Sequence, residues 1–250
     1  MTSIILESIV LSFALAFPAT LIAIVANRAS HTQLPASSQR WAIGIFITLL
    51  GVWFAAAVLL AKANLFTLPA DAPQIPRLIL LLLGGSLMVW ALANFTAAGR
   101  AILQATDQSV FMGLQILRVI GFVFLVGWAM GPVPWEFAMP AGLGDIATGI
   151  LAVFAYKATR SNASNARALI IRVHILGLLD FVAAIGTGVL TSNGYFHLLS
   201  TDAPNIVDHY PLVLVPAFFV PLFLTAHILS IQKLLACGHN SPGRRPAGHS

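Results

Sequence analysis

The sequence has 250 residues, of which 58% are hydrophobic and only 8% are charged, against about 25% charged in a typical soluble domain. A soluble domain must cover itself with a largely polar surface, so this composition and a mean hydropathy of +0.90 exclude that class and predict an all-α integral membrane protein. The net charge is +5, but the basic residues are scattered through short loops, so we expect no nucleic-acid partner. The single cysteine, Cys237, excludes a disulfide framework within the chain.

Seven stretches are long and apolar enough to cross a bilayer, which takes about 20 mostly apolar residues. Turn-forming residues separate them, and no connection is long enough for a second folded domain. We therefore expect one seven-helix transmembrane domain over residues 1–237, embedded in a lipid bilayer. Residues 238–250 are rich in Gly, Pro, Ser and His and are predicted to form a disordered cytoplasmic tail. The predicted spans are 4–26, 41–61, 78–96, 109–130, 136–158, 168–192 and 211–236.

Lys and Arg residues fall mainly on one side of the predicted bundle. Nine lie in the connections after the first, third and fifth spans or near the C-terminus, whereas only Lys62 and Arg77 lie on the opposite side. Cytoplasmic loops carry the excess of basic residues. The N-terminus is therefore predicted outside, and the C-terminus in the cytoplasm, of a plasma membrane or a bacterial inner membrane. The nine residues are Arg28, Arg40, Arg100, Lys157, Arg160, Arg167, Lys233, Arg244 and Arg245.

Two predicted spans each carry a carboxylate beside small residues. The fifth span contains Gly142, Gly144 and Asp145, and the sixth contains Gly177 and Asp180. At 1.5 Å per residue, Asp145 lies ~13 Å and Asp180 ~17 Å from the outer ends of two antiparallel helices. The glycines allow the two backbones to approach closely. A carboxylate at this depth is costly unless it faces a partner or water, so the pair predicts a proton or cation site. The alternative is that each carboxylate caps or binds a neighbouring helix and only fixes packing.

A second group of ionisable residues lies closer to the cytoplasmic side. Arg118 is in the inner half of the fourth span and needs a carboxylate, for which Asp145 or Asp180 is available. A structural salt bridge explains Arg118 as well as a substrate-binding role does. His174 and His227 lie at comparable depths on consecutive spans, an arrangement compatible with ligation of haem b and equally with a proton relay.

Internal prolines interrupt two of the last spans. Pro140 lies in the fifth span, and Pro211, Pro216 and Pro221 lie in the seventh. A proline inside a helix frees the carbonyl four residues earlier and kinks the helix. Broken helices beside mid-membrane charges are typical of transporter binding sites, although kinks also occur in membrane helices that transport nothing.

These features favour a small transporter or a proton- or cation-coupled carrier for a small-molecule or ion substrate. The residues expected to form its pathway are Asp145, Asp180, Arg118, His174 and His227. A haem-binding redox or sensory protein and a non-catalytic accessory subunit of a membrane complex remain open alternatives. We find no P-loop, no metalloprotease His-Glu motif and no serine nucleophile elbow, which disfavours an enzyme.

Two further features bear on assembly and ligands. Gly127 and Gly131 form a helix-packing motif that serves either inside the fold or between protomers, so the sequence is compatible with an oligomer. The last outer connection holds His197, Asp202 and Asp208, which are metal-ligating residue types, but their spacing fits no standard site and we favour a solvated loop.

The first three spans are almost wholly apolar, and we expect them to serve as scaffold.

Overall fold

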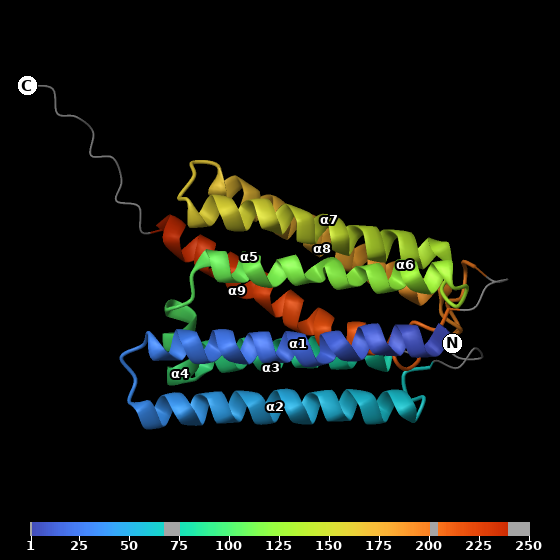
Figure 1. Ribbon diagram of the computed structural model, residues 1–250, viewed down its shortest axis with the longest axis horizontal. Helices are drawn as coiled ribbons and strands as arrows, with labels where there is room; N and C mark the ends of the chain where they lie inside the picture. The colour runs from blue at the N-terminus through green and yellow to red at the C-terminus, as the bar shows by residue number, and fades with distance from the viewer. Residues whose placement is uncertain (1, 68–75, 201–204, 240–250) are drawn as a thin grey trace, which may run out of the picture.

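Helices run side by side between two ends of the molecule in the computed structural model, which describes residues 2–67, 76–200 and 205–239 (Figure 1). Seven spans are long and apolar enough to cross a membrane, and no strand occurs in the described part of the chain. The all-α prediction is confirmed, and the helix pattern supports a multi-pass membrane protein. The tail predicted beyond residue 237 lies outside the described residues except for the last two residues of the final helix.

The chain forms nine α-helices, one 3-10 segment and one π-helical segment over the described residues. The first three spans are α1 (Thr2–Ser30), α2 (Ala36–Lys62) and α3 (Arg77–Phe95). The short α4 (Ala97–Gln104) precedes a composite fourth span of α5 (Gln108–Ile116), the 3-10 segment η1 (Leu117–Gly121) and α6 (Phe122–Ala129). The last three spans are α7 (Trp135–Arg160), α8 (Ala166–Thr191) and the π-helical η2 (Val215–Phe219) continued by α9 (Val220–His239).

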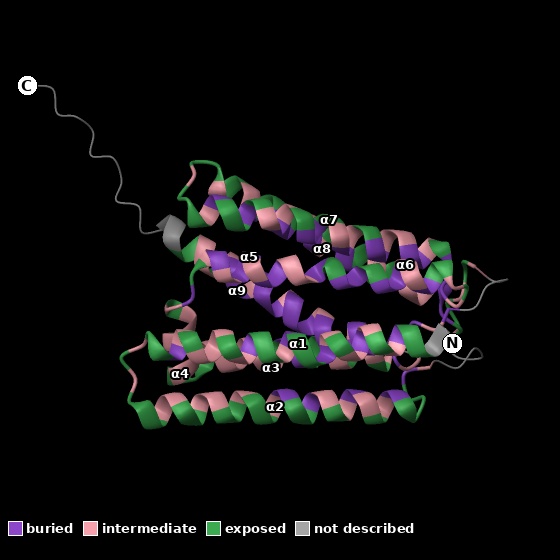
Figure 2. Cartoon of the chain, in the orientation of Figure 1, coloured by how far each residue is buried: buried purple, intermediate pink, exposed green. Residues whose placement is uncertain are grey.

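The last span forms the centre of the bundle. In Figure 1, α9 runs obliquely from the ends of α7 and α8, past α5, to the level of α1 and α3. In its apolar window 67% of the residues are buried, against 17% in α2 and in α3, and Figure 2 shows this contrast along the helices. We call the end that holds the N-terminus the N-terminal end of the bundle, and the end where α9 finishes the C-terminal end (Figure 1).

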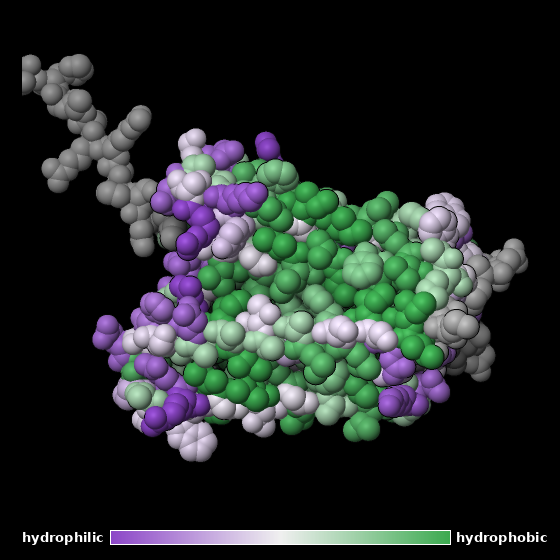
Figure 3. Space-filling model, viewed as in Figure 1, coloured by the Kyte–Doolittle hydropathy of each residue, from purple (hydrophilic) through white to green (hydrophobic). Residues whose placement is uncertain are grey.

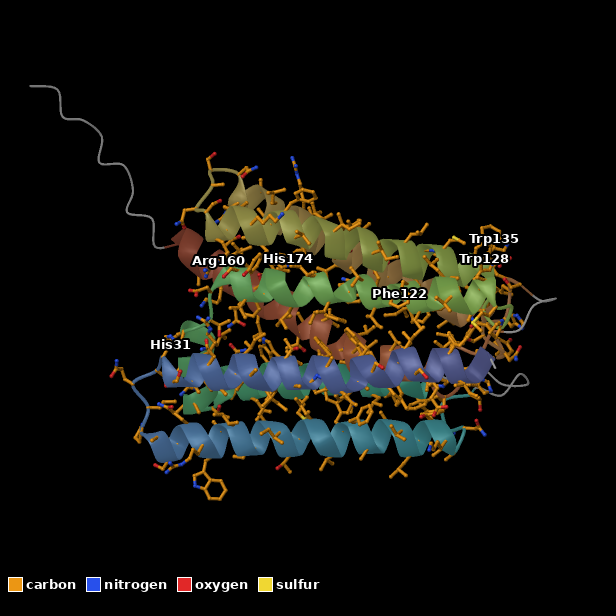
Figure 4. The ribbon with its side chains drawn as sticks, in the orientation of Figure 1. His31, Phe122, Trp128, Trp135, Arg160 and His174 are labelled. Atoms are coloured by element: carbon orange, nitrogen blue, oxygen red, sulfur yellow. The ribbon has the colours of Figure 1, made fainter. Side chains whose placement is uncertain are left out.

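The surface has the pattern expected of a protein that sits in lipid. An apolar band covers the middle of the face seen in Figure 3, and hydrophilic residues gather at the two ends. Trp128 and Trp135 are exposed near the N-terminal end, and His31 and Arg160 lie at the C-terminal end (Figure 4). Tryptophan is enriched where a bilayer meets water, so the two tryptophans lie where a membrane boundary is expected.

The seventh span differs from its prediction at its first residues. Its helical part begins at Val215, about one turn after the predicted start at residue 211. Pro216 has no N–H with which to bond the Leu212 carbonyl, and this carbonyl accepts instead from the Val215 N–H in a tight turn (3.0 Å). The chain then continues as a π-helical turn, in which the Val220 N–H bonds the Val215 carbonyl five residues back.

The fourth span and the stretch before it also differ from prediction. The sequence predicts one regular helix over 109–130, but η1 interrupts it in the middle although no proline stands there. The sequence predicts a connection between the third and fourth spans, but the structure has the helix α4 there. This helix begins after Thr96, whose hydroxyl accepts a hydrogen bond from the Gly99 N–H (2.9 Å), as an N-cap does.

Helices α2 and α3 hold the broken seventh span in place. Pro221 cannot donate to the Ala217 carbonyl, and Trp53 of α2 supplies the missing donor from its indole Nε1 (3.2 Å). The Trp53 ring lies against Gly85 of α3, where a Cβ would collide with it. Ser86 of α3 donates to the Pro221 carbonyl (3.2 Å). Helices α2 and α3 therefore contact the seventh span through specific hydrogen bonds as well as through apolar packing, while their scaffold role stays a prediction.

Replacing Trp53 with Phe tests this support. Trp53→Phe keeps most of the apolar ring but leaves the buried Ala217 carbonyl without a donor, which costs about 1–3 kcal/mol. We expect a lower thermal unfolding temperature in detergent. Trp41→Phe is the matched control, because Trp41 is 73% exposed, and it is expected to unfold at the wild-type temperature. Equal unfolding temperatures for the two variants would contradict this role of Trp53.

Candidate functional site

Arg118 lies at the middle of the fourth span, in η1, and its side chain is completely buried. Its guanidinium donates from Nε to Asp145 Oδ1 (2.7 Å) and from Nη2 to Asp180 Oδ2. Its Nη1 donates to the Gly177 carbonyl and to His227 Nε2, each at 3.1 Å. Helices α7, α8 and α9 thus all supply acceptors to a single cation. A 3-10 segment inside a helix commonly marks a hinge or a functional position.

Small and aromatic residues shape the space around this guanidinium. The Phe181 ring covers it, with its centroid 3.9 Å from Arg118 Cζ, an arrangement in which the ring attracts the cation. Gly121 lies against Asp145, and Gly144 against Asp180, so closely that a Cβ at either glycine would collide with the carboxylate side chain. A Cβ at Gly177 would lie 2.6 Å from Arg118 Nη1 and from His227 Nε2. These glycines are therefore required for the close approach of the helices.

The charges of this cluster do not balance. Arg118 carries one positive charge, and the two carboxylates carry two negative charges when both are ionised, which leaves one negative charge in a buried site. Asp145 and Asp180 are both buried, and Asp180 Oδ1 has no hydrogen-bond partner among the described residues. An uncompensated charge at membrane depth is costly. One bound proton or one cation would neutralise the site.

A cavity of about 100 Å³ connects the carboxylates with the N-terminal end of the bundle. Asp145 and Asp180 lie on its wall. Ser192, directly after α8, and Asp208, in the connection that follows, also line it. Most of the remaining lining is apolar, and Pro216 contributes from the broken seventh span. Water occupies about 30 Å³ per molecule in the liquid, so the cavity has room for a few water molecules.

Asp208 gives the cavity a third acidic group, from the connection that precedes the seventh span. Its carboxyl is buried and accepts from His209 Nδ1 (2.7 Å). Burial raises the pKa of Asp208, whereas the charge and the hydrogen bond of His209 lower it, and burial is the larger effect.

On the opposite side of Arg118, side chains form a chain of hydrogen bonds towards the C-terminal end. His227 Nδ1 lies 2.7 Å from His174 Nδ1, and His174 Nε2 lies 2.9 Å from Ser230 Oγ. The Ser230 hydroxyl donates to Gln108 Oε1 (2.6 Å), and Gln108 Nε2 donates back to the Ser230 carbonyl (3.0 Å). Both histidines and Ser230 are buried, whereas Gln108 is half-buried at the start of α5. Figure 4 shows His174 nearer the C-terminal end than Phe122.

Residues 75–235 match the model of one protein family, described as "Domain of unknown function (DUF8737)". The chain belongs to this family. The matched segment begins after α2 and contains every residue of the site, from Gln108 to Ser230. No curated protein and no solved structure matches the chain.

The structure places all five sequence-predicted residues in one network within the family segment. Arg118 binds both aspartates, where the sequence left the choice between them open. Their role in a pathway remains a prediction. Sequence reasoning missed Ser230 and Gln108. Ser230 lies three residues after His227, and this spacing places two side chains on one face of a helix. The spacing could therefore have identified Ser230. Gln108 carried no such signal.

The two histidines do not fit haem in this arrangement. A bis-histidine haem places the iron and its porphyrin between the two ligating nitrogens, but His174 and His227 bond each other directly at 2.7 Å. Haem ligation would require α8 and α9 to separate. Elsewhere in the described ranges, no group of three or more His, Cys, Asp or Glu side chains is placed to hold a metal ion. Asp202 of the predicted outer loop lies outside these ranges.

The predicted glycine motif in the fourth span contributes to packing inside the fold. Gly127 is buried, and a Cβ there would lie 2.6 Å from Val133 Cγ2 and 3.9 Å from Leu212 Cδ1. Gly131 lies in the following turn with φ of +95°, a conformation that favours glycine. Gly127 therefore serves contacts within the chain, and the prediction of an oligomer finds no support from it.

Removing the Arg118 charge tests how the cluster is balanced. Arg118→Met leaves two buried carboxylates without a counter-charge, and breaking a buried ion pair in this way costs about 3–5 kcal/mol. We expect the unfolding temperature in detergent to fall strongly. Adding Asp145→Asn and Asp180→Asn to this variant removes the excess negative charge and should restore much of the loss. A triple variant no more stable than Arg118→Met would contradict this account.

Gly144 provides a test of the close contact between α7 and α8. Gly144→Ala places a methyl group against the Asp180 carboxylate, and such overpacking costs about 1–3 kcal/mol. Gly186→Ala is the matched control, because no atom lies within 4 Å of a Cβ at this α8 position. We expect thermal unfolding to show destabilisation at Gly144 and none at Gly186. Equal stability of the two variants would show that the Asp180 side chain moves aside at no cost.

Proposed function

We propose that this protein is a small membrane carrier whose transport is coupled to a proton or another cation bound at Asp145 and Asp180. The observation that carries the proposal is one guanidinium shared by two buried carboxylates, which leaves one negative charge to be neutralised. A packing role alone needs one carboxylate for Arg118, and the site has two. When both carboxylates are ionised, the second one carries a charge that Arg118 does not neutralise, so the site can bind and release a cation.

Access to the carboxylates supports the same function. The cavity reaches them from the N-terminal end, whereas the chain of histidines begins on the other side of Arg118. Alternating access needs a site near the middle of the membrane that each side reaches in turn, and the cavity and the polar chain approach this site from opposite sides. An ion pair that only fixed packing would need neither.

The broken seventh span is placed to change shape beside the site. Pro216 and Val220 line the cavity, and His227 on the same span bonds Arg118. π-helical turns and prolines weaken the regular bonding of a helix, and π-bulges occur frequently at functional sites. A movement of this span would alter the cavity and the contacts of Arg118 together.

The proposal includes an orientation and a location. The excess of Lys and Arg at the C-terminal end supports an orientation with that end in the cytoplasm. The cavity near Asp208 then opens towards the outside, and Gln108 lies at the cytoplasmic side. We place the protein in a plasma membrane or a bacterial inner membrane, with a small molecule or an ion as its substrate.

Proton uptake into proteoliposomes tests this function. The purified chain is reconstituted with a pH-sensitive dye inside, and uptake is followed after an outward potassium gradient with valinomycin sets the membrane potential. We expect Asp145→Asn and Asp180→Asn to lower uptake to the level of empty vesicles, because an amide does not ionise. Asp107→Asn is the control, since Asp107 is an exposed partner of Arg28 at the C-terminal end.

Two outcomes of this experiment contradict the proposal. One is wild-type uptake in both variants, which would assign the pair a purely structural role and favour an accessory subunit. The other is proton uptake by wild-type vesicles that is no faster than by empty vesicles, whichever monovalent cation replaces potassium in the outer buffer. Size-exclusion profiles and unfolding temperatures of each variant establish that it is folded.

A further inference from the structure

We infer that the coupling cation is a proton, and that His227, His174 and Ser230 form its path between the acid pair and the C-terminal end, with Arg118 as the barrier between the two halves. This inference rests on the proposed function and names the ion that the site binds. It assigns a role to residues that the carrier proposal leaves unused.

The direction of every hydrogen bond in this path follows from Arg118. A guanidinium has donors only, so His227 Nε2 must accept, and a neutral His227 then carries its proton on Nδ1. That proton is donated to His174 Nδ1, which leaves the proton of a neutral His174 on Nε2, donated to Ser230 Oγ. The Ser230 proton is donated to Gln108. All the bonds point the same way, as a proton-conducting chain requires.

A proton moves along this chain by successive transfers that conserve charge. A proton that arrives at His227 Nε2 forms an imidazolium, which passes its Nδ1 proton to His174 Nδ1. His174 then passes its Nε2 proton to Ser230 Oγ. The original Ser230 proton, which Gln108 Oε1 accepts at rest, leaves to water that enters when the half-buried Gln108 side chain turns aside. One proton enters and one leaves. Rotation of the hydroxyl group and of the rings restores the starting arrangement.

Arg118 closes this path in the arrangement described. It occupies His227 Nε2 and cannot itself relay a proton, because a guanidinium stays protonated in proteins. Asp180 and His227 bind the two terminal nitrogens of the same guanidinium. A proton that neutralises Asp180 weakens its hold on Nη2, and a shift of Arg118 then opens His227 Nε2 to the proton. Proton binding at the acid pair and proton movement along the path are therefore coupled, because the path opens only when the pair has bound a proton.

The surroundings of the path favour a proton over a metal cation. Metal cations of the Ca²⁺ and Mg²⁺ type take six or more oxygen ligands, whereas the two carboxylates of the cluster have four oxygens, and Arg118 already binds two of them. The charged groups at the start of the path are Arg118, Asp145 and Asp180. Near the C-terminal end of the path, Lys233 bonds the backbone carbonyls of residues 103, 104 and 106. Phe181 packs edge-on to His227 with centroids 5.9 Å apart.

The test uses the reconstituted full-length protein in buffer whose only added cation is choline, with the pH gradient as driving force. We expect proton uptake by the wild-type protein to continue in choline. Ser230→Ala and His174→Gln should each slow it by about a hundredfold, the lower end of the contribution of a positioned proton-transfer group. Ser230→Thr keeps the hydroxyl and should restore uptake. Thr225→Val is the matched control, because it removes a buried hydroxyl from the same helix outside the path.

The outcomes separate this inference from the proposed function. Loss of uptake in Asp180→Asn, with wild-type rates in both Ser230→Ala and His174→Gln, overturns the path and leaves the carrier. Uptake that requires sodium and ceases in choline overturns the proton as the ion and also leaves the carrier. Wild-type rates in Asp180→Asn and Asp145→Asn overturn the carrier, and the inference with it. Equal slowing by Ser230→Ala and Thr225→Val assigns Ser230 to packing and overturns its place in the path.

Discussion

A fully buried guanidinium at the middle of the bundle is the constraint on which the structure depends. A charge at this depth costs several kcal/mol unless it is paired and hydrogen-bonded, and Arg118 meets that requirement with two carboxylates, a backbone carbonyl and an imidazole. These acceptors come from three different helices, so the arginine fixes their mutual positions. Glycines stand where helices must approach it most closely.

The guanidinium also divides the bundle into two halves with different chemistry. The half towards the N-terminal end holds the acid pair and a mostly apolar cavity, and the half towards the C-terminal end holds a chain of neutral hydrogen-bonding side chains. The broken seventh span passes both halves. Helix α2 binds its Ala217 carbonyl, which Pro221 leaves without a donor, and α3 binds the Pro221 carbonyl. A change at the guanidinium is therefore linked to the one span that is least regular.

Hydropathy predicts the seven spans and their approximate ends, because lipid exposure forces long apolar stretches. The depths of Asp145 and Asp180 followed from helix rise alone. Which carboxylate meets Arg118 depends on rotation of each helix about its axis, which a single sequence with apolar residues on all sides does not specify. The 3-10 turn at η1 lacks a proline, and α4 is short and amphipathic, so neither had a signal in hydropathy. Orientation of the termini rests on charge distribution and remains a prediction.

In the proposed carrier, the acid pair binds one exchangeable proton. Infrared difference spectroscopy of the purified protein over a range of pH measures this most directly, because a protonated carboxyl group has a carbonyl band that a carboxylate lacks. The wild-type spectrum is predicted to hold a titrating carboxyl band that is absent from the Asp145→Asn/Asp180→Asn double variant and is kept in Asp208→Asn, which removes another buried carboxyl group. A wild-type spectrum with no titrating carboxyl band beyond those of the double variant would contradict proton binding at the pair.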